Sequence, residues 1–187
     1  MIESPVRLPG EVVGPRVVLR RWTLDDVPRF SAVIARNLEH LRPWMPWVQH
    51  EPLTDADRAA LVDAWERAWL DGGDVGFGIF LDGEPIGGCG LHRRRGPHGL
   101  EIGYWIDKDH LNQGFATEAA RILTSAALGL PGITFVEIHH DKANVASSRV
   151  PQHLGFTFAG ETPDEVTSPA EVGIDCGWRM TVDEWHD

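Results

Sequence analysis

The chain of 187 residues is long enough for one domain with a sizeable core, because a domain of this length buries roughly 70% of its unfolded surface. Its 17 Lys and Arg residues against 28 Asp and Glu residues give a formal net charge of −11, which repels a nucleic-acid backbone. The apolar runs are shorter than the about 20 residues of a membrane span, and the N-terminus lacks the apolar segment of a secretory signal. We therefore expect a single cytoplasmic domain over residues 1–187, with neither nucleic acid nor a membrane as partner.

The two cysteines are the first candidates for special chemistry. Cys89 and Cys176 lie far apart, and neither has the nearby Cys or His residues that a zinc site shows. Free cysteines are among the residues most often buried. We therefore expect two core thiols and no bound metal.

The N-terminal part of the chain predicts one strand followed by two helices. Residues 16–22 are rich in β-branched residues, which is typical of a strand. Residues 23–37 follow with a helical pattern. The helix over residues 54–70 is indicated more strongly, because Thr54 can cap it and its apolar residues recur on one face. Trp65 and Trp69 share that face, so we expect them in the core.

The middle of the chain predicts three strands and a helix. Asp82 and Gly83 divide the apolar stretch 75–92, and an Asp-Gly pair in that position is the strongest short signal for a β-hairpin. Residues 100–106 predict a fourth strand. An Ala-rich pattern then predicts a helix over about 114–128.

The C-terminal part alternates between strands and one short helix. A fifth strand is expected at 133–140 and a helix at 144–155, ending at a glycine. The segments 156–161 and 173–180 predict two closing strands.

This order of elements predicts an α/β (α+β) fold, in which about four helices cover a mixed, mostly antiparallel sheet of seven strands. The strand-helix-strand unit of residues 100–140 requires a right-handed crossover, which makes strands four and five parallel neighbours. Ligands bind beyond the carboxyl ends of the strands in such sheets. The segment DHLNQGFATEAA, residues 109–120, occupies that place.

The start of the helix in this segment has the features of a phosphate cradle. Phe115 and the apolar residues one and two turns later share one face, so the helix packs on the sheet and its first turn stays open. Free N–H groups and the positive end of the helix dipole suit a phosphate. Gly114 and Ala116 leave room for it, and Thr117 could add a hydroxyl. The same residues fit a plain helix cap equally well.

Five segments together resemble a known family. LEIGYWIDKDHLNQGFATEAA, residues 100–120, resembles the acetyl-CoA-binding motif of the GNAT superfamily, whose usual form is Arg/Gln-x-x-Gly-x-Gly/Ala. LRRWTLDD, LRPWMPW, NVASSRVPQHLGF and WRMTVDEW resemble the branch that includes the ribosomal-protein N-acetyltransferases RimJ and RimL. The matches extend from about residue 16 to residue 185. The resemblance implies a GNAT fold with strands four and five splayed, acetyl-CoA as co-substrate, and a homodimer.

The resemblance also implies which residues hold the coenzyme. Gly114 and Ala116 match the motif's Gly and Gly/Ala, whereas Leu111 stands where Arg or Gln is usual and Asn112 replaces a frequent glycine. The pantetheine arm would pair with the backbone of strand four, as an added strand does. The implied coenzyme contacts are Tyr104, Trp105, Ile106, Asn112, Gln113, Gly114, Phe115, Ala116, Thr117, Asn144 and Ser147.

Acylation of an amine needs a neutral nitrogen. An α-amine with a pKa near 7.7 is roughly 15% neutral at pH 7, whereas a lysine side chain with a pKa near 10.4 is only about 0.04% neutral. An N-terminal amine therefore needs a general base far less than a lysine does. By resemblance, Glu101 at the start of strand four is the general base. The alternative is an outward, solvated carboxylate. His139 and His140 are further candidates and point to opposite faces of their strand.

The reaction also needs a polarised carbonyl and a protonated leaving sulfur. A strand-four N–H near Tyr104 or Trp105 would hold the oxyanion. NVAS matches the family's Asn-x-x-Ser, so Asn144 would contact the pantetheine arm and Ser147 would protonate the sulfur. An Asn helix cap with a Ser in the first turn is the alternative. Because Pro151 lacks the N–H that would bond the carbonyl of residue 147, we expect a kink or a short helix.

Two tryptophans are candidates for the acceptor pocket. Trp44 and Trp47 are held in a loop by two prolines, where they could wall the pocket, stack on a cation, or seal the helix pair below them. Residues 93–95, three consecutive arginines, could reach the 3′-phosphate of the coenzyme or form a solvated hairpin tip.

The sequence as a whole predicts an acyl-CoA-dependent N-acyltransferase. It would transfer acetyl from acetyl-CoA to a primary amine, either a protein N-terminal α-amine or a small-molecule amine, by direct attack in a ternary complex. The alternatives are a catalytically idle acyl-CoA-binding sensor and the same enzyme with another donor such as succinyl-CoA.

Overall fold

The computed structural model describes residue 7 and residues 9–186, and this part of the chain forms one sheet of eight strands. The strands lie in the order β1-β2-β3-β4-β5-β6-β8-β7. Their bounds are β1 Glu11–Val13, β2 Val18–Arg21, β3 Val75–Leu81, β4 Glu84–His92, β5 Gly99–Ile106, β6 Phe135–Asp141, β7 Thr157–Pro163 and β8 Ile174–Thr181.

Five α-helices and three short 3₁₀ helices accompany the sheet within the described residues. The α-helices are α1 Val27–Ala35, α2 Leu38–Leu41, α3 Asp55–Leu70, α4 Phe115–Leu128 and α5 Val145–His153. The 3₁₀ helices are η1 Leu24–Asp26, η2 Pro46–His50 and η3 Lys108–His110.

The α/β fold class is confirmed, and two counts from the sequence are corrected. The sheet has eight strands instead of seven, because the three-residue strand β1 pairs antiparallel with β2. The α-helices number five in the described chain instead of about four, because α2 is a single four-residue turn. Both extra elements are too short to produce a recognisable period in the sequence.

Local sequence signals correctly located the β3–β4 hairpin and the start of α3. Asp82 and Gly83 both have positive φ angles, 50° and 83°, as a tight hairpin turn requires. Thr54 accepts a hydrogen bond from the backbone N–H of Asp57, which is the predicted cap. These signals depend only on neighbouring residues, so the rest of the fold does not override them.

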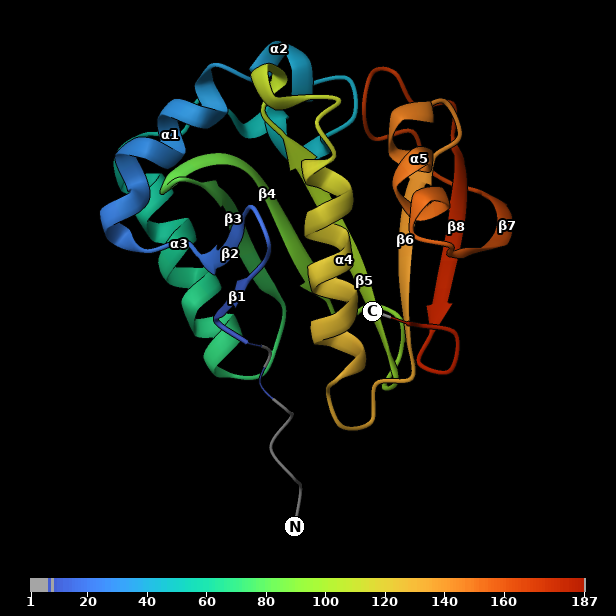
Figure 1. Cartoon of the computed structure of the whole chain (residues 1–187). Helices are drawn as coiled ribbons and strands as arrows, with labels where there is room; N and C mark the ends of the chain where they lie inside the picture. The colour runs from blue at the N-terminus through green and yellow to red at the C-terminus, as the bar shows by residue number, and fades with distance from the viewer. Residues whose placement is uncertain (1–6, 8, 187) are drawn as a thin grey trace.

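Helices cover both faces of the sheet, as Figure 1 shows for α4 in front of β5. α4 packs on β4, β5 and β6 in the larger core cluster, together with Phe77 and Ile79 of β3. Phe80 of β3 belongs instead to a second cluster with α1 and α3. Because side chains alternate along a strand, these two clusters lie on opposite faces. Cys89 and Cys176 are free thiols and both are buried, as predicted.

The parallel pairing of β5 with β6 ends before either strand does. Gly99 to Ile102 pair in parallel with Phe135 to Ile138, and the pairing stops there. β5 nevertheless continues to Ile106 and stays paired with β4, while β6 continues to Asp141 and stays paired with β8. The two strands therefore separate at their carboxyl ends, and the predicted splay is confirmed.

Among the described residues, no helix is long and apolar enough to cross a bilayer.

Asp107 fixes the end of β5 to the N-terminal helices. It is 1% exposed and accepts hydrogen bonds from the Arg36 guanidinium, at 2.7 Å from Nε, and from the backbone N–H of Asp109. Burial raises the pKa of the Asp107 carboxyl, but the Arg36 hydrogen bonds and charge lower it more, so that pKa lies below its ordinary value. Asp107 therefore stabilises the fold as a carboxylate.

Asp107→Asn should lower the free energy of unfolding at pH 7 by about 2 kcal/mol, because it leaves Arg36 without its anionic partner. A carboxyl with a depressed pKa contributes stability that is fully present above its unfolded pKa of about 3.9 and is lost as the pH falls through the folded value. Urea unfolding at pH 7 and pH 3 should therefore show a smaller difference between wild type and variant at pH 3. An equal difference at both pH values would contradict the assignment.

Candidate active site

A cavity of about 1040 Å³ lies beside the separated ends of β5 and β6. Its wall is formed by the β5 residues from Glu101 to Trp105, by the end of β6, and by the first turn of α5. Segments from the N-terminal helices and from the β7–β8 connection complete it. The splay and the cavity thus meet along the second half of β5.

The cavity brings together about half of the residues singled out from the sequence. These are Trp44, Trp47, Glu101, Tyr104, Trp105, Asn144 and Ser147, together with the alternatives His139 and His140. Ile106 and residues 112–117 do not line it. The sequence therefore indicated two separate places, the cavity and the start of α4.

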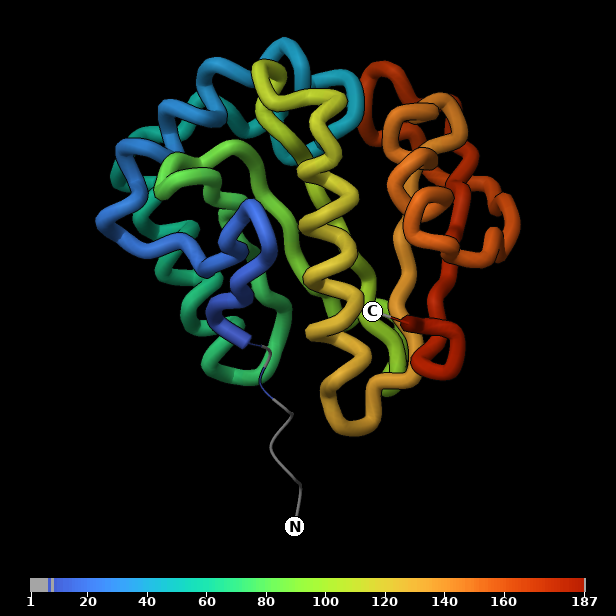
Figure 2. Tube along the Cα trace, in the orientation of Figure 1, coloured from blue at the N-terminus to red at the C-terminus, as the bar shows by residue number. Residues whose placement is uncertain are grey.

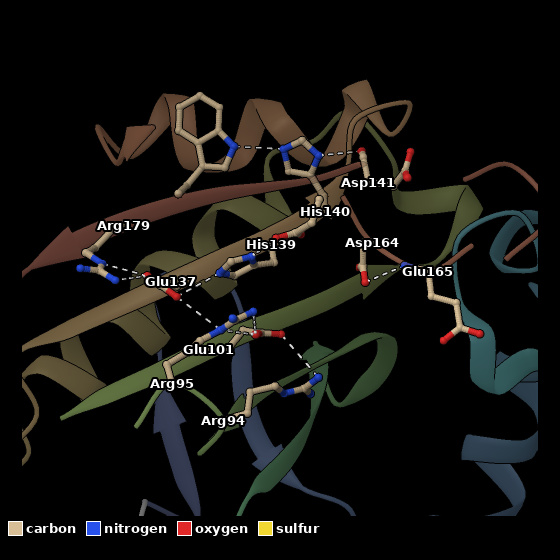
Figure 3. Close-up of polar contacts among 12 residues, drawn as sticks. Arg94, Arg95, Glu101, Glu137, His139, His140, Asp141, Asp164, Glu165 and Arg179 are labelled. Atoms are coloured by element: carbon tan, nitrogen blue, oxygen red, sulfur yellow. Dashed lines mark hydrogen bonds and ion pairs between the residues drawn. The ribbon is translucent and has the colours of Figure 1, made fainter. Parts of the chain in front are cut away.

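Glu101 lies in the cavity wall and is tightly ion-paired (Figure 3). Its side chain is 12% exposed, so it is not an outward, solvated carboxylate. Arg95 contacts Oε2 at 2.7 Å from Nε and 2.5 Å from Nη2, and Arg94 lies 3.6 Å from Oε1. Arg95 thus folds back on Glu101, whereas Arg94, whose side chain is 57% exposed, stays solvated beside it.

A buried Glu137 continues this charged cluster across the sheet (Figure 3). Glu137 lies beside Glu101 in the β5–β6 register, and its side chain is 8% exposed. Arg179 donates to it at 2.8 Å from Nε, His139 contacts it at 3.0 Å from Nε2, and Arg95 lies 3.3 Å away. Arg95 therefore bridges Glu101 to Glu137.

His139 is held between two carboxylates. Its Nδ1 lies 2.6 Å from Asp175 and its Nε2 lies 3.0 Å from Glu137. Burial lowers the pKa of His139, but the hydrogen bonds with Asp175 and Glu137 raise it more, so that pKa lies above its ordinary value. A histidine whose two ring nitrogens are both hydrogen-bonded to carboxylates is a poor general base.

His140 is also engaged at both ring nitrogens. The indole N–H of Trp178 donates to Nε2 at 3.0 Å, so the ring hydrogen is on Nδ1, which donates to the carbonyl of Asp141 at 2.8 Å. Neither histidine thus offers a free lone pair to a substrate.

The first turn of α5 presents Ser147 to the cavity. Asn144 caps the helix, because its Oδ1 accepts from the backbone N–H of Ser147 at 3.2 Å. Within the described part of the chain, Ser147 Oγ makes no hydrogen bond, whereas Oγ of neighbouring Ser148 donates to the carbonyl of Val145 at 2.8 Å. The helix includes Pro151 and ends two residues later, so it is short but not interrupted at Ser147.

The start of α4 forms an open cradle. Asn112 and Gly114 have positive φ angles of 58° and 81°, which turn the chain into the helix. The hydrogen bonds of the described residues leave the backbone N–H groups of Phe115, Ala116 and Thr117 free, as expected for a first helical turn. These amides and the helix dipole suit an anion.

Arg16, from the β1–β2 connection, closes one side of the cradle. It donates to the carbonyl of Gln113 at 3.0 Å and to Glu118 at 2.5 Å. A side-chain carbon on Gly114 would lie 3.5 Å from its Nη2. Sequence patterns could not predict this contact, because nearly a hundred residues separate Arg16 from Gly114.

Aromatic side chains line the cavity beside Trp105 of β5, near a loop from the far end of the chain. The Trp47 ring packs against Trp105 at 6.3 Å between centroids. The β7–β8 connection reaches the segment that follows α2 (Figure 2). There the backbone N–H of Ala170 donates to the carbonyl of Pro43 at 3.1 Å. Asp164 and Glu165 of that connection line the cavity and were missed in the sequence, because nothing local distinguishes them from other surface acids.

His139→Gln should lower the free energy of unfolding by about 2 kcal/mol at pH 6 and by less at pH 9. A histidine with a raised pKa contributes stability that is fully present below its unfolded pKa of about 6.5 and is lost as the pH rises through the folded value. Urea unfolding at both pH values measures this, with the exposed His186→Gln as control. A larger loss at pH 9 than at pH 6 would show that His139 is held neutral.

Comparison with known proteins agrees with this geometry. A model of the acetyltransferase (GNAT) domain matches residues 16–157. A Bacillus subtilis protein named "Putative ribosomal N-acetyltransferase YdaF" is 28% identical over 153 residues, which cover 81% of this chain and 84% of that protein.

Solved structures share the fold. A crystal structure of a "Probable acetyltransferase" is 25% identical with a TM-score of 0.83, covering 91% of this chain and 96% of that one. RimL, a ribosomal L7/L12 alpha-N-protein acetyltransferase solved with coenzyme A, is 19% identical with a TM-score of 0.83, covering 96% of this chain and all of the other. The family match spans more than half of the sequence, and the chain therefore belongs to the GNAT family of N-acetyltransferases.

Proposed function

We propose that this chain transfers an acetyl group from acetyl-CoA directly to a primary amine that arrives as a cation in the cavity. The observation that carries the proposal is the meeting of the β5–β6 splay with this cavity at Tyr104, Trp105 and Ser147. We further propose that residues 1–187 act as one cytoplasmic domain and that the chain forms a homodimer.

The donor site is supported by the backbone. Beyond Ile102, β5 has no partner on its β6 side among the described residues, so its backbone can pair with the amides of a pantetheine arm. The free amides at Phe115, Ala116 and Thr117, with the Arg16 guanidinium beside Gly114, fit the coenzyme's diphosphate. This fit does not need a side chain at Leu111 or Asn112. RimL, which shares the fold, was solved with coenzyme A.

The reaction forms a bond between the amine nitrogen and the acetyl carbon and breaks the bond from that carbon to sulfur. The ammonium first releases one proton to solvent, which leaves a neutral amine. In the acylation step one further proton leaves the nitrogen and one proton reaches the sulfur. We assign to Glu101 the proton that leaves the neutral amine, and to Ser147 the proton that reaches the sulfur. Ser147 lines the cavity, and its hydroxyl makes no hydrogen bond in the described chain. His139 and His140 are not assigned, because both rings are fully hydrogen-bonded.

The acceptor class is supported by the charge and shape of the cavity. Asp164, Glu165 and Asp175 line it with Glu101, so an ammonium is attracted before it loses its proton. Trp44 and Trp47 give aromatic walls that suit a cation or its aliphatic stem. The name of the Bacillus subtilis relative, a ribosomal N-acetyltransferase, favours a protein N-terminal α-amine over a small-molecule amine.

One observation favours a second candidate function, a catalytically idle acyl-CoA sensor. Arg94 and Arg95 contact both oxygens of Glu101, so this carboxylate must give up part of an ion pair before it takes a proton. A sensor would bind the thioester without consuming it. Turnover therefore discriminates between the two functions.

The protein should release coenzyme A when it is mixed with acetyl-CoA and a basic peptide that has a free N-terminal α-amine. The release should be slower with succinyl-CoA. Ser147→Ala should lower kcat about 100-fold, because a positioned acid typically contributes 10²- to 10⁴-fold. The control is Ser148→Ala, which changes the neighbouring hydroxyl and should leave kcat within about twofold. A thiol-detecting assay over a panel of peptides, polyamines and amino acids measures both. If the protein binds acetyl-CoA saturably but releases no coenzyme A with any combination of donor and amine, the result would support the sensor instead.

A further inference from the structure

Pro151 leaves a helical carbonyl of α5 without its usual donor. In an α-helix the N–H of residue 151 would bond the carbonyl of residue 147, and proline has no N–H. Pro151 is buried inside α5, and the helix continues past it to His153. The carbonyl of Ser147 therefore needs a donor from elsewhere, since an unpaired polar group in a partly buried place is costly.

The Tyr104 hydroxyl supplies that donor. It comes from β5, 43 residues earlier in the chain, and donates to the carbonyl oxygen of Ser147 at 3.0 Å. The contact spans the splay from β5 to α5, beside the cavity that both residues line. Burial raises the pKa of the Tyr104 phenol, so the hydroxyl keeps its proton and stays a donor across the physiological range.

Ser147 is consequently held on both sides of its own backbone. Its N–H donates to Oδ1 of Asn144, and its carbonyl accepts from Tyr104. Asn144 is local to the helix, whereas Tyr104 belongs to the strand that we assign to the thioester. Among the hydrogen bonds of the described residues, the Tyr104 contact alone ties Ser147 to β5.

We propose that Tyr104 is a positioning residue for Ser147. Its hydroxyl donates to the Ser147 carbonyl the hydrogen bond that a backbone N–H at position 151 would otherwise donate. The inference rests on the proposed function for its effect on turnover, but not for the contact itself. If the hydroxyl replaces a backbone N–H, then restoring that N–H should make the hydroxyl dispensable. Pro151→Ala restores it and introduces a good helix former.

A thermal double-mutant cycle tests the contact without any assay of activity. Tyr104→Phe should lower Tm by about 3 °C, as the loss of one hydrogen bond does in a chain of this length. In the Pro151→Ala background the same change should lower Tm by less than half as much. The control background is Gln152→Ala, an exposed position next to Pro151, where the effect of Tyr104→Phe should be unchanged.

Turnover tests the positioning role. Tyr104→Phe should lower kcat for acetyl-CoA about three- to tenfold, with little change in KM, and Tyr104→Phe with Pro151→Ala should recover to within about twofold of wild type. With an acetyl thioester of a nitrothiophenol, whose leaving thiolate needs no proton, the deficit of Tyr104→Phe in kcat/KM should shrink, as should that of Ser147→Ala. A purely structural loss would affect both donors equally.

The outcomes separate the two claims. Equal Tm shifts in the wild-type and Pro151→Ala backgrounds would overturn the contact, whatever the activity. Coupled Tm shifts, together with wild-type turnover of Tyr104→Phe or an unrescued double variant, would overturn the positioning role. A third outcome is a smaller Tm shift of Tyr104→Phe in the Pro151→Ala background, in a protein that releases no coenzyme. This would support the contact but reject the proposed function, and with it the positioning role of Tyr104 in turnover.

Discussion

The parallel pairing of β5 with β6 ends at Ile102 and Ile138, and the rest of the site depends on that early end. Beyond it, β5 remains held by β4 and β6 remains held by β8, so the two strands separate without losing their own supports. The separation exposes strand backbone to a ligand and brings Tyr104 opposite the first turn of α5. The cavity therefore extends from the N-terminal helices to the separated ends of β5 and β6.

A charged cluster around the paired part of these strands decides which groups can move a proton. Arg95 joins Glu101 to Glu137, and His139 joins Glu137 to Asp175. The two carboxylates raise the pKa of His139 and engage both of its ring nitrogens, so His139 is a poor general base. Glu101 and Ser147, whose hydroxyl makes no hydrogen bond in the described chain, line the cavity beside this cluster. Local electrostatics, more than residue type, therefore selects the proposed pair.

The sequence predicted what depends on neighbouring residues or on chain handedness. The Thr54 cap, the Asp82-Gly83 turn and the parallel crossover belong to this class. It did not predict contacts between residues distant in sequence, such as His139 with Asp175 or Arg16 with the start of α4. Pro151 shows this limit of sequence-based prediction most clearly. The sequence identified the Ser147 carbonyl as lacking its helical donor, but it could not identify Tyr104 as the donor that takes its place.

Amide hydrogen exchange with and without acetyl-CoA tests the central claim, that the separated strands and the start of α4 together form the coenzyme site. The account predicts slower exchange in peptides that cover residues 103–106 of β5 and residues 115–117 of α4, with exchange in β1 to β3 unchanged. Protection at only one of the two places, or at neither, would contradict it.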